Sequence, residues 1–242
     1  VKGDITVSDV AFSYDKNKEL IKNLSFELKS GQRLAVVGPT GCGKTTLINL
    51  LMHFYDIDSG SIKVDSVDIN TVSRKSLRQN VGMVLQDTWL KSGTIKENIF
   101  FGNVNVSDEQ CIEAAKKSHA HSFIKKLHNG YDTFIGEDGG SLSTGQKQLI
   151  CITRLMLNPP PILILDEATS SIDLLTEQRI TRSFMKLMKD RTSFVVAHRL
   201  KTIVESDLIL VMKDGKVIES GTHKSLMEQN GFYKELYQSQ FD

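Results

Sequence analysis

The chain has 242 residues with nearly balanced charge: 30 Lys and Arg against 29 Asp and Glu, for a formal net charge of +1. This balance excludes a strongly basic nucleic-acid binder, which needs clustered positive charge. A content of 40% hydrophobic and 24% charged residues is typical of a globular protein rather than a disordered one. No apolar run approaches the roughly 18 residues that a membrane-spanning helix needs, so we expect these residues not to cross a membrane themselves.

The three cysteines, Cys42, Cys111 and Cys151, are odd in number and widely spaced. They provide neither a disulfide framework nor metal-ligand spacing, which fits a reducing compartment. No signal peptide is visible. The chain begins Val1-Lys2-Gly3 without an initiator Met, which is compatible with a piece of a longer polypeptide and equally with removal of the Met.

The first part of the chain has the pattern of β-structure. Apolar residues alternate with polar ones over 5–12 and 21–28, which predicts antiparallel strands. Leu34–Val37 is a short, fully apolar run that ends at Gly38, and it predicts a buried strand. A Gly-rich loop follows, and then an apolar helix over 47–51.

Beyond this point, strands and helices alternate on either side of a helical middle. We expect strands at Ser61–Val64, Val81–Leu85, Ile162–Leu165, Ser193–Val196, Leu208–Met212 and Lys216–Glu219, and a helix over Leu175–Met188. The middle predicts helices at Thr94–Phe101, Ser107–Lys117, Ser122–Leu127 and Thr144–Leu157. Strand–helix alternation implies a parallel sheet with helices on its faces, and the helical middle indicates an inserted subdomain over 88–158.

The loop after the buried strand has the P-loop pattern G-x-x-x-x-G-K-[ST], spelled Gly-Pro-Thr-Gly-Cys-Gly-Lys-Thr over 38–45. Its glycines allow successive backbone N–H groups to converge on phosphate oxygens, and the helix that starts near Lys44 directs its positive end at the same anion. Lys44 is expected to reach the β- and γ-phosphates, and the Thr45 hydroxyl to ligate Mg²⁺. Cys42 is either a redox-sensitive thiol beside the phosphates or a small residue whose side chain points away, and we favour the second interpretation.

Two acids follow the apolar strand at 162–165. Asp166 and Glu167 stand at the carboxyl end of this strand, where ligands bind in open α/β sheets. We expect Asp166 to hold Mg²⁺ directly or through water, and Glu167 to orient and polarise the attacking water as a general base. Considered alone, the pair is also compatible with a solvated acidic turn.

A second helix N-terminus lies at Leu142-Ser143-Thr144-Gly145-Gln146, where Ser143 is a plausible N-cap. From local physics this is either an anion site or simply a capped helix. The pentapeptide, however, closely resembles the LSGGQ signature of ABC ATPases, and it lies between the P-loop and the acid pair as in that family. Four further segments match the family in order: Tyr14 the adenine-stacking aromatic, Gln86 the Q-loop glutamine, 170–173 the D-loop, and His198 the switch histidine.

This resemblance covers about residues 3–241. It implies an α/β fold: a P-loop NTPase core with a parallel sheet, an N-terminal antiparallel β subdomain and an inserted helical signature subdomain. ATP and Mg²⁺ are the implied cofactors. The implied catalytic residues are Glu167, His198, Lys44 and Gln86, and the implied metal ligands are Thr45, Gln86 and Asp166. The implied nucleotide-binding residues are Tyr14, Gly38, Pro39, Thr40, Gly41, Cys42, Gly43, Lys44, Thr45, Thr46, Ser143, Gly145 and Gln146.

Two segments, 92–99 and 130–140, resemble exporters whose membrane and ATPase domains are fused, and the second resembles their X-loop. The implied protein is an exporter half for a drug, lipid or peptide at the cytoplasmic face of the plasma membrane, with an N-terminal transmembrane domain outside these 242 residues. Its implied partners are a second nucleotide-binding domain and the coupling helices of the membrane domain, with no nucleic acid. A finer resemblance, in 152–154 and at the C-terminus, is to the subunit of heterodimeric multidrug exporters that keeps the catalytic glutamate.

Two residues depart from the family pattern, Thr144 in the signature and Ser171 in the D-loop. Three alternatives remain: a soluble ABC ATPase acting on nucleic acid or the ribosome, the ATPase subunit of an importer, and a non-enzymatic nucleotide sensor. The chain has no sustained heptads and only one cassette, which argues against the soluble ABC ATPase. The segment 136–140 argues by resemblance against the importer subunit. The presence of both Glu167 and His198 argues against the non-enzymatic sensor. The transported substrate is not readable from these residues.

Overall fold

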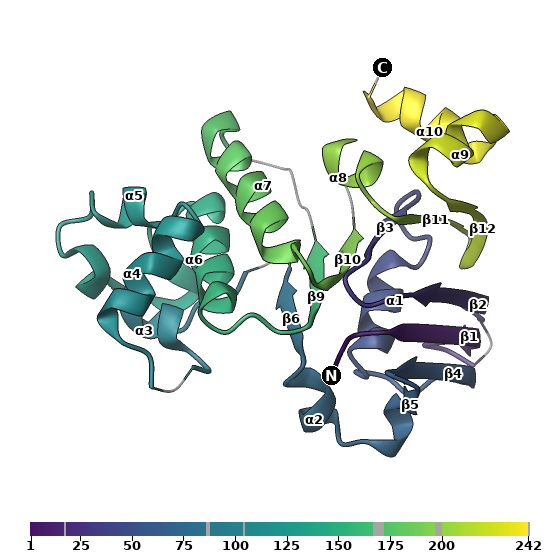
Figure 1. Cartoon of the computed structure of the whole chain (residues 1–242), viewed down its shortest axis with the longest axis horizontal. Coiled ribbons are helices and arrows are strands. Elements are labelled where there is room, and N and C mark those ends of the chain that lie inside the picture. The colour runs from purple at the N-terminus through teal and green to yellow at the C-terminus, as the bar shows by residue number, and fades with distance from the viewer. Residues whose placement is uncertain (17, 86–87, 104, 167–171, 197–199, 242) are drawn as a thin grey trace. The chain divides into compact units, whose positions relative to one another are not determined.

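The computed structural model describes residues 1–16, 18–85, 88–103, 105–166, 172–196 and 200–241, and it has the predicted α/β fold (Figure 1). The chain forms two compact units. The first comprises Val1–Met83, Pro161–Glu167 and Asp190–Asp242, and the second comprises Val84–Pro160 and Ala168–Lys189. None of the helices in the described part of the chain is long and apolar enough to span a membrane.

The first unit contains an antiparallel sheet with the strand order β2-β1-β4-β5. Its strands are β1 (Ile5–Phe12), β2 (Ile21–Leu28), β4 (Ser59–Val64) and β5 (Val67–Asp68). β1 pairs antiparallel with both β2 and β4, which confirms the prediction from the alternating pattern. In β2 every second residue from Leu24 onward is buried, because successive side chains of a strand point to opposite faces.

The other sheet of this unit has six strands in the order β12-β11-β3-β10-β9-β6. The strands are β3 (Arg33–Val37), β6 (Val81–Val84), β9 (Ile162–Asp166), β10 (Thr192–Val196), β11 (Leu208–Lys213) and β12 (Lys216–Gly221). β3 pairs parallel with β10 and β11, and β10 pairs parallel with β9, as predicted. β12 departs from the predicted parallel sheet, because a two-residue turn at Asp214 and Gly215 makes it an antiparallel edge strand.

One hydrophobic core joins the two sheets of this unit through α1 (Lys44–Leu51). The helix buries Leu47, Ile48, Leu50 and Leu51 against apolar residues of β1, β2, β3 and β10. Each fully buried leucine or isoleucine stabilises the fold by about 1.5–3 kcal/mol, so the core fixes the position of this helix relative to β3.

Four short helices of the first unit were not predicted. They are α2 (Arg74–Arg78), α8 (Leu200–Val204), α9 (His223–Gln229) and α10 (Phe232–Phe241). Tertiary contacts stabilise them: the Glu219 carboxylate accepts hydrogen bonds from the backbone N–H groups of Phe232 (2.6 Å) and Tyr233 (2.9 Å) at the start of α10.

The second unit is mainly helical. Its helices are α3 (Ile95–Phe100), α4 (Asp108–Lys117), α5 (His121–Ile124), α6 (Thr144–Leu157) and α7 (Leu174–Met188). The predicted helices agree with these, except that α5 is shorter than the predicted 122–127. Two short strands, β7 (Gly93–Thr94) and β8 (Phe134–Ile135), also pair here within the stretch predicted to be mostly helical.

Buried hydroxyl groups connect three helices of the second unit. The Ser118 and Thr153 hydroxyls lie 2.6 Å apart, and the Ser183 hydroxyl donates to the Ser118 carbonyl at 2.8 Å. All three side chains are fully buried. Buried polar groups that are fully paired specify one packing arrangement, so these contacts fix α4, α6 and α7 relative to one another.

Asp65 anchors the start of the chain. It lies in the two-residue turn between β4 and β5, and its carboxylate accepts hydrogen bonds from the backbone N–H groups of Lys2, Gly3 and Asp4 at 2.6–2.9 Å. Partial burial raises the pKa of Asp65, but these three donors outweigh it and the net shift lowers that pKa below its usual 3.8.

We therefore expect Asp65→Asn to destabilise the fold by about 1–2 kcal/mol at neutral pH, because hydrogen bonds to a charged acceptor are the stronger ones. Because the pKa of Asp65 is lower in the folded state than in the unfolded state, its ionised carboxylate stabilises the fold at pH values above the unfolded-state pKa. This stabilisation is lost as the pH falls through the folded-state pKa. The deficit of the variant, measured by urea unfolding, should accordingly shrink below about pH 4.

Asp214→Asn is the matched control. Asp214 occupies the corresponding positive-φ position of the β11–β12 turn, with φ of 48° against 50° for Asp65, and its carboxylate makes no hydrogen bond or ion pair to the described residues. An equal effect of both variants at neutral pH would contradict the anchoring role of Asp65.

Candidate nucleotide site

The loop over 38–43 connects the end of β3 to the start of α1 and is shaped by close backbone approaches. Gly38 has φ of 152°, and a Cβ atom there would overlap the carbonyl oxygen of Met212. Gly43 has φ of 107°, and a Cβ atom would lie 2.7 Å from Cδ1 of Ile21. Only glycine fits at both positions, so the sequence pattern that predicted the loop has a steric cause here.

The positive end of α1 is open to an anion. Gly43, the N-cap residue, provides no side-chain hydrogen bond to the helix, and the first turn contains no acidic residue. The Lys44 ammonium group lies over the loop, 2.7 Å from the Gly38 carbonyl oxygen and 3.0 Å from that of Pro39. Uncapped N–H groups together with an adjacent ammonium group suit a phosphate chain. The residues present therefore fit a nucleoside triphosphate.

The two threonines after Lys44 differ in exposure. Thr45 is exposed, so its hydroxyl is accessible at the start of α1, whereas Thr46 is buried in the core side of the helix. An accessible hydroxyl beside a phosphate chain is the kind of hard oxygen ligand that Mg²⁺ prefers. Thr45 therefore fits the predicted metal ligand, and the Thr46 side chain contributes to packing.

Cys42 is packed beneath the loop. Its side chain is only 3% exposed, its carbonyl accepts a hydrogen bond from Gly215 (3.2 Å), and its sulfur lies 3.8 Å from the Lys44 ammonium group. These contacts favour the interpretation of Cys42 as a small packing residue.

Strand register aligns the loop with the acid at the end of β9. Val36, Val196 and Asp166 are successive partners across β3, β10 and β9. Because these strands run parallel, the chain leaves all three at the same edge of the sheet, where α/β proteins bind their ligands. Asp166 therefore lies at the same sheet edge as Gly38. Gln86, Glu167 and His198, the other predicted catalytic residues, lie outside the described residues.

Tyr14 lies beside α1, and the residue is half exposed (50%). Its hydroxyl accepts a hydrogen bond from the Asn49 amide at 3.1 Å. Its ring makes T-shaped contacts with the rings of Phe12 and Tyr55, with distances between ring centroids of 4.8 and 5.0 Å. The prediction named Tyr14 but not Asn49 or Tyr55, which are 35 and 41 positions away and have no local signal that connects them to it.

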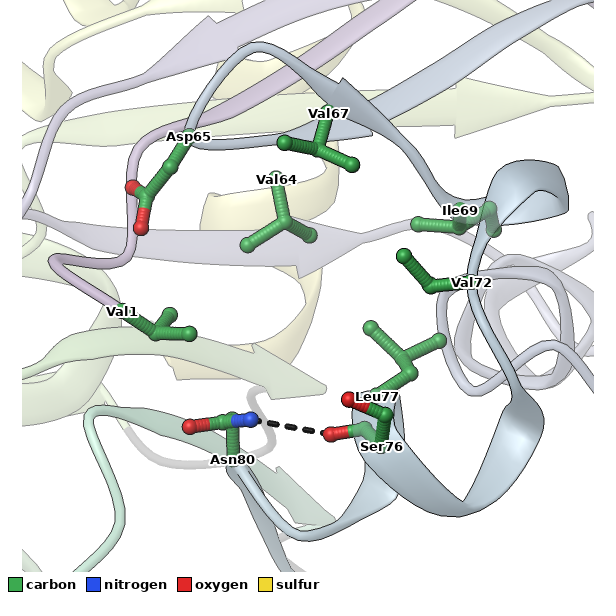
Figure 2. Close-up of a pocket in the computed structure, with 9 residues that line it drawn as sticks. All are labelled: Val1, Val64, Asp65, Val67, Ile69, Val72, Ser76, Leu77 and Asn80. Atoms are coloured by element: carbon green, nitrogen blue, oxygen red, sulfur yellow. Dashed lines mark hydrogen bonds between the residues drawn. The ribbon is translucent and has the colours of Figure 1, made fainter.

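A partly open cavity of about 220 Å³ lies elsewhere in the first unit (Figure 2). It is lined by Val1, Val64, Asp65, Val67, Ile69, Val72, Ser76, Leu77 and Asn80. These described lining residues are mostly apolar and include no lysine or arginine. A triphosphate needs positive charge or converging N–H groups, so this cavity does not suit the nucleotide.

The signature segment belongs to the second unit and begins α6. Ser143 is its N-cap, as predicted: its hydroxyl accepts from the Gln146 N–H (3.3 Å), and the Gln146 side chain accepts from the Ser143 N–H (3.0 Å). This reciprocal capping box was not foreseen. Ser143 and Thr144 are exposed, so the Ser143 hydroxyl can still donate its hydrogen to an external acceptor.

Gly145 is buried where α6 and α7 meet. A Cβ atom at this position would overlap Cγ2 of Thr176 and lie 3.2 Å from Cγ2 of Ile172. The N-cap of α7 lies next to this contact: the N–H of Thr176, and then its hydroxyl, hydrogen-bond to Asp173 and lower the pKa of that carboxyl. Gly145 is therefore required for helix packing irrespective of any ligand.

The P-loop joins a strand of the parallel sheet to α1, and an acid lies at the same edge of the sheet. This arrangement defines a nucleoside-triphosphate-binding domain. The family model of ABC transporters matches residues 21–170. The chain belongs to the ABC transporter family, as an ATP-binding and ATP-hydrolysing domain. The family match confirms the resemblance to ABC ATPases inferred from the sequence, and the two sheets and the helical unit described above confirm the α/β fold class.

Three relatives illustrate this membership. An uncharacterized ABC transporter ATP-binding protein of Bacillus subtilis, YfiC, is 51% identical over 240 residues, covering 99% of this chain and 40% of its own length. A fatty acid ABC transporter ATP-binding/permease protein of Mycobacterium bovis is 49% identical, covering 97% and 37%. A solved bacterial Atm1-family ABC exporter with ATP bound matches with a TM-score of 0.92 and 41% identity, covering 100% and 42%. The chain thus spans about two fifths of the length of these relatives.

The packing at Gly145 is testable by repair. We expect Gly145→Ala to destabilise the chain by about 1–3 kcal/mol, because a methyl group is forced into an occupied space. Adding Thr176→Ser removes the overlapping methyl group but keeps the hydroxyl, and should restore most of the loss in chemical unfolding. Gly136→Ala, where a Cβ atom would meet nothing within 4 Å, is the control. Failure of Thr176→Ser to restore stability would show that the contact with Thr176 is not the cause.

Proposed function

We propose that this chain is the motor domain of an ABC exporter, in which ATP binding closes two such domains head to tail and hydrolysis reopens them. The observation that carries this proposal is the uncapped, lysine-bearing start of α1 at the sheet edge that also carries Asp166. Relatives named as an ATP-binding/permease protein and as an exporter with ATP bound support the transport role.

In this proposal the residues around α1 divide the work on the triphosphate. Lys44 and the backbone N–H groups of 38–46 bind the phosphates, and Tyr14 stacks on the adenine. Thr45, Asp166 and Gln86 hold Mg²⁺, which when bound offsets charge on the β- and γ-phosphate oxygens. Glu167 accepts a proton from the attacking water, and Lys44 and His198 stabilise the charge that develops on the transferred group.

The second domain contributes its signature helix to each ATP. The start of α6, with Ser143, Gly145 and Gln146, is a second helix N-terminus that gains an anion to bind only when a γ-phosphate is present. ATP therefore favours the closed pair, and hydrolysis removes much of that preference, as a switch requires. Ser143 can take part without losing its cap, because its oxygen accepts from Gln146 while its hydrogen remains available.

A membrane domain is the third component. The two exporter-like segments are adjacent in the second unit, where Gly93 pairs with Ile135 and Thr94 with Phe134. Phe134 is 68% exposed there. Exposed aromatic side chains are typical of interfaces, so this paired segment is a candidate surface for the coupling helices. We propose that residues 88–158 act as the helical subdomain that carries this contact together with the signature.

The remaining properties concern the whole transporter. We propose that the membrane domain precedes Val1, that this chain works at the cytoplasmic face of the plasma membrane, and that the exported compound is a drug, lipid or peptide chosen by membrane helices. The partner domain is either a second copy of this chain or a related half. No nucleic acid is required.

ATP-dependent dimerisation of Glu167→Gln tests the proposal. We expect this change to slow hydrolysis by about 10²–10⁴-fold through loss of the general base, while ATP still binds. The trapped ATP should then convert monomers into dimers in size-exclusion chromatography with light scattering.

The control is Lys44→Ala combined with Glu167→Gln, which should stay monomeric with ATP because the phosphates are held too weakly. Undiminished turnover in Glu167→Gln would rule out its role as the base. A monomer that binds ATP tightly would overturn self-pairing and direct the search to a related partner half.

A further inference from the structure

The exposed ring of Tyr14 is held in one orientation by groups from three parts of the first unit. Phe12 on β1 and Tyr55 after α1 each meet it edge to face, at interplanar angles of 87° and 85°. The Asn49 amide on α1 donates to its hydroxyl. An exposed tyrosine usually retains rotamer freedom, so three such contacts are more than packing of a surface residue requires.

Asn49 connects Tyr14 to the helix that starts at the phosphate loop. It lies five residues after Lys44, which is about 7.5 Å along a helix axis. The helix is fixed by its buried leucines and isoleucine. A hydrogen bond from this helix to the Tyr14 hydroxyl therefore sets the distance between the ring and the phosphate-binding end of α1.

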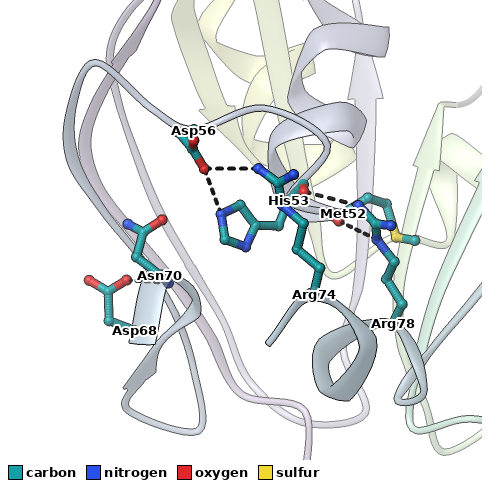
Figure 3. Close-up of polar contacts among 7 residues, drawn as sticks. All are labelled: Met52, His53, Asp56, Asp68, Asn70, Arg74 and Arg78. Atoms are coloured by element: carbon teal, nitrogen blue, oxygen red, sulfur yellow. Dashed lines mark hydrogen bonds and ion pairs between the residues drawn. The ribbon is translucent and has the colours of Figure 1, made fainter. Parts of the chain in front are cut away.

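Tyr55 is equally well fixed, because the turn that carries it is clamped (Figure 3). The neighbouring carboxylate of Asp56 contacts the His53 ring at 2.9 Å and Arg74 at 3.2 Å, and these hydrogen bonds, from His53 and then from Arg74, lower the pKa of Asp56. Arg78 donates to the carbonyls of Met52 (3.1 Å) and His53 (3.0 Å).

Two arginines of α2, Arg74 and Arg78, make the contacts that hold this turn. Arg74 and Arg78 lie one turn apart on that helix, and the Arg78 guanidinium also stacks over the ring of Phe54 at 4.5 Å. Charge-assisted hydrogen bonds from arginine have fixed geometry, so the turn over 52–56 is held at both of its ends. Tyr55 consequently meets the Tyr14 ring at a near-perpendicular angle from a fixed turn.

We propose that Asn49 and Tyr55 are positioning residues that preorganise the Tyr14 ring as the platform for the nucleotide base. The inference rests on the proposed role of Tyr14 in adenine stacking and extends it to two residues outside the phosphate loop over 38–45. A preorganised platform binds the base without the entropy loss of ordering the ring at that moment. Asn49 and Tyr55 should hence affect the base portion of ATP binding and leave the triphosphate portion unchanged.

The experiment measures dissociation constants of the full chain for ATP and for inorganic tripolyphosphate by calorimetry. Tyr14→Leu removes the ring and should raise the dissociation constant for ATP about tenfold or more. Asn49→Leu should raise it roughly three- to tenfold, by loss of one hydrogen bond. Binding of tripolyphosphate should stay unchanged in both variants, whereas general damage to the fold would weaken both ligands.

A double-mutant cycle shows whether Asn49 acts through the Tyr14 hydroxyl. Tyr14→Phe removes that hydroxyl alone, so Asn49→Leu should have no further effect in its presence. Independent, multiplicative losses would overturn the positioning role of Asn49. For the second residue, Tyr55→Leu should weaken ATP binding, while Tyr55→Phe keeps the aromatic ring and its near-perpendicular contact with Tyr14, and should bind like the unchanged chain.

The outcomes distinguish the positioning role of Asn49 and Tyr55 from the proposed stacking of Tyr14 on the adenine. If Tyr14→Leu leaves ATP affinity unchanged, the stacking role of Tyr14 fails, and with it the platform. If Tyr14→Leu weakens ATP binding but Asn49→Leu and Tyr55→Leu do not, stacking stands and the positioning role is overturned. Equal losses for ATP and tripolyphosphate in the Asn49 and Tyr55 variants would overturn it as well.

Discussion

The N–H groups at the start of α1 are the feature on which the rest of the site depends, because they remain uncapped only if the chain turns from β3 into the helix without a side-chain acceptor. Gly43 satisfies this requirement with φ of 107°, and Gly38 allows the loop to pass against the Met212 carbonyl. Both glycines are placed by the central position of β3 between β10 and β11. The proposed anion site is thus a consequence of strand order as much as of the loop sequence.

The same helix organises both ends of the proposed nucleotide. Its first turn carries Lys44, proposed to bind the phosphates, and Asn49 in its last turn contacts the aromatic ring proposed to bind the base. At its carboxyl end, the Arg78 guanidinium donates a hydrogen bond to the Met52 carbonyl. A positive charge at this end is favourable because it interacts with the negative end of the helix dipole. Because this helix is anchored in the core, it would hold the two proposed contacts at a fixed distance from each other.

The local sequence pattern was sufficient to predict the elements that have strong apolar periodicity or characteristic turn and capping residues. β3, α1, α6 and the phosphate loop agree with prediction because apolar runs, glycines and capping residues act within a few positions. α2 and α10 were missed because tertiary contacts stabilise them: α2 through Arg78 bonding to the end of α1, and α10 through the Glu219 carboxylate at its start. The contacts of Tyr14 with Asn49 and Tyr55 likewise span 35 to 41 positions, a distance over which no local pattern operates.

The starts of α1 and α6 show how one motif can be adjusted to two tasks. α1 has no side-chain cap and relies on the core to hold it, so its N–H groups are available to a ligand at all times. α6 carries a complete capping box from Ser143 and Gln146, so it is stable without any ligand. In the proposed mechanism the signature helix meets a phosphate only in the closed pair, so in the open state its end needs a cap of its own. The hydroxyl group permits both states, since a serine oxygen can accept the cap hydrogen bond while its hydrogen is donated to a phosphate.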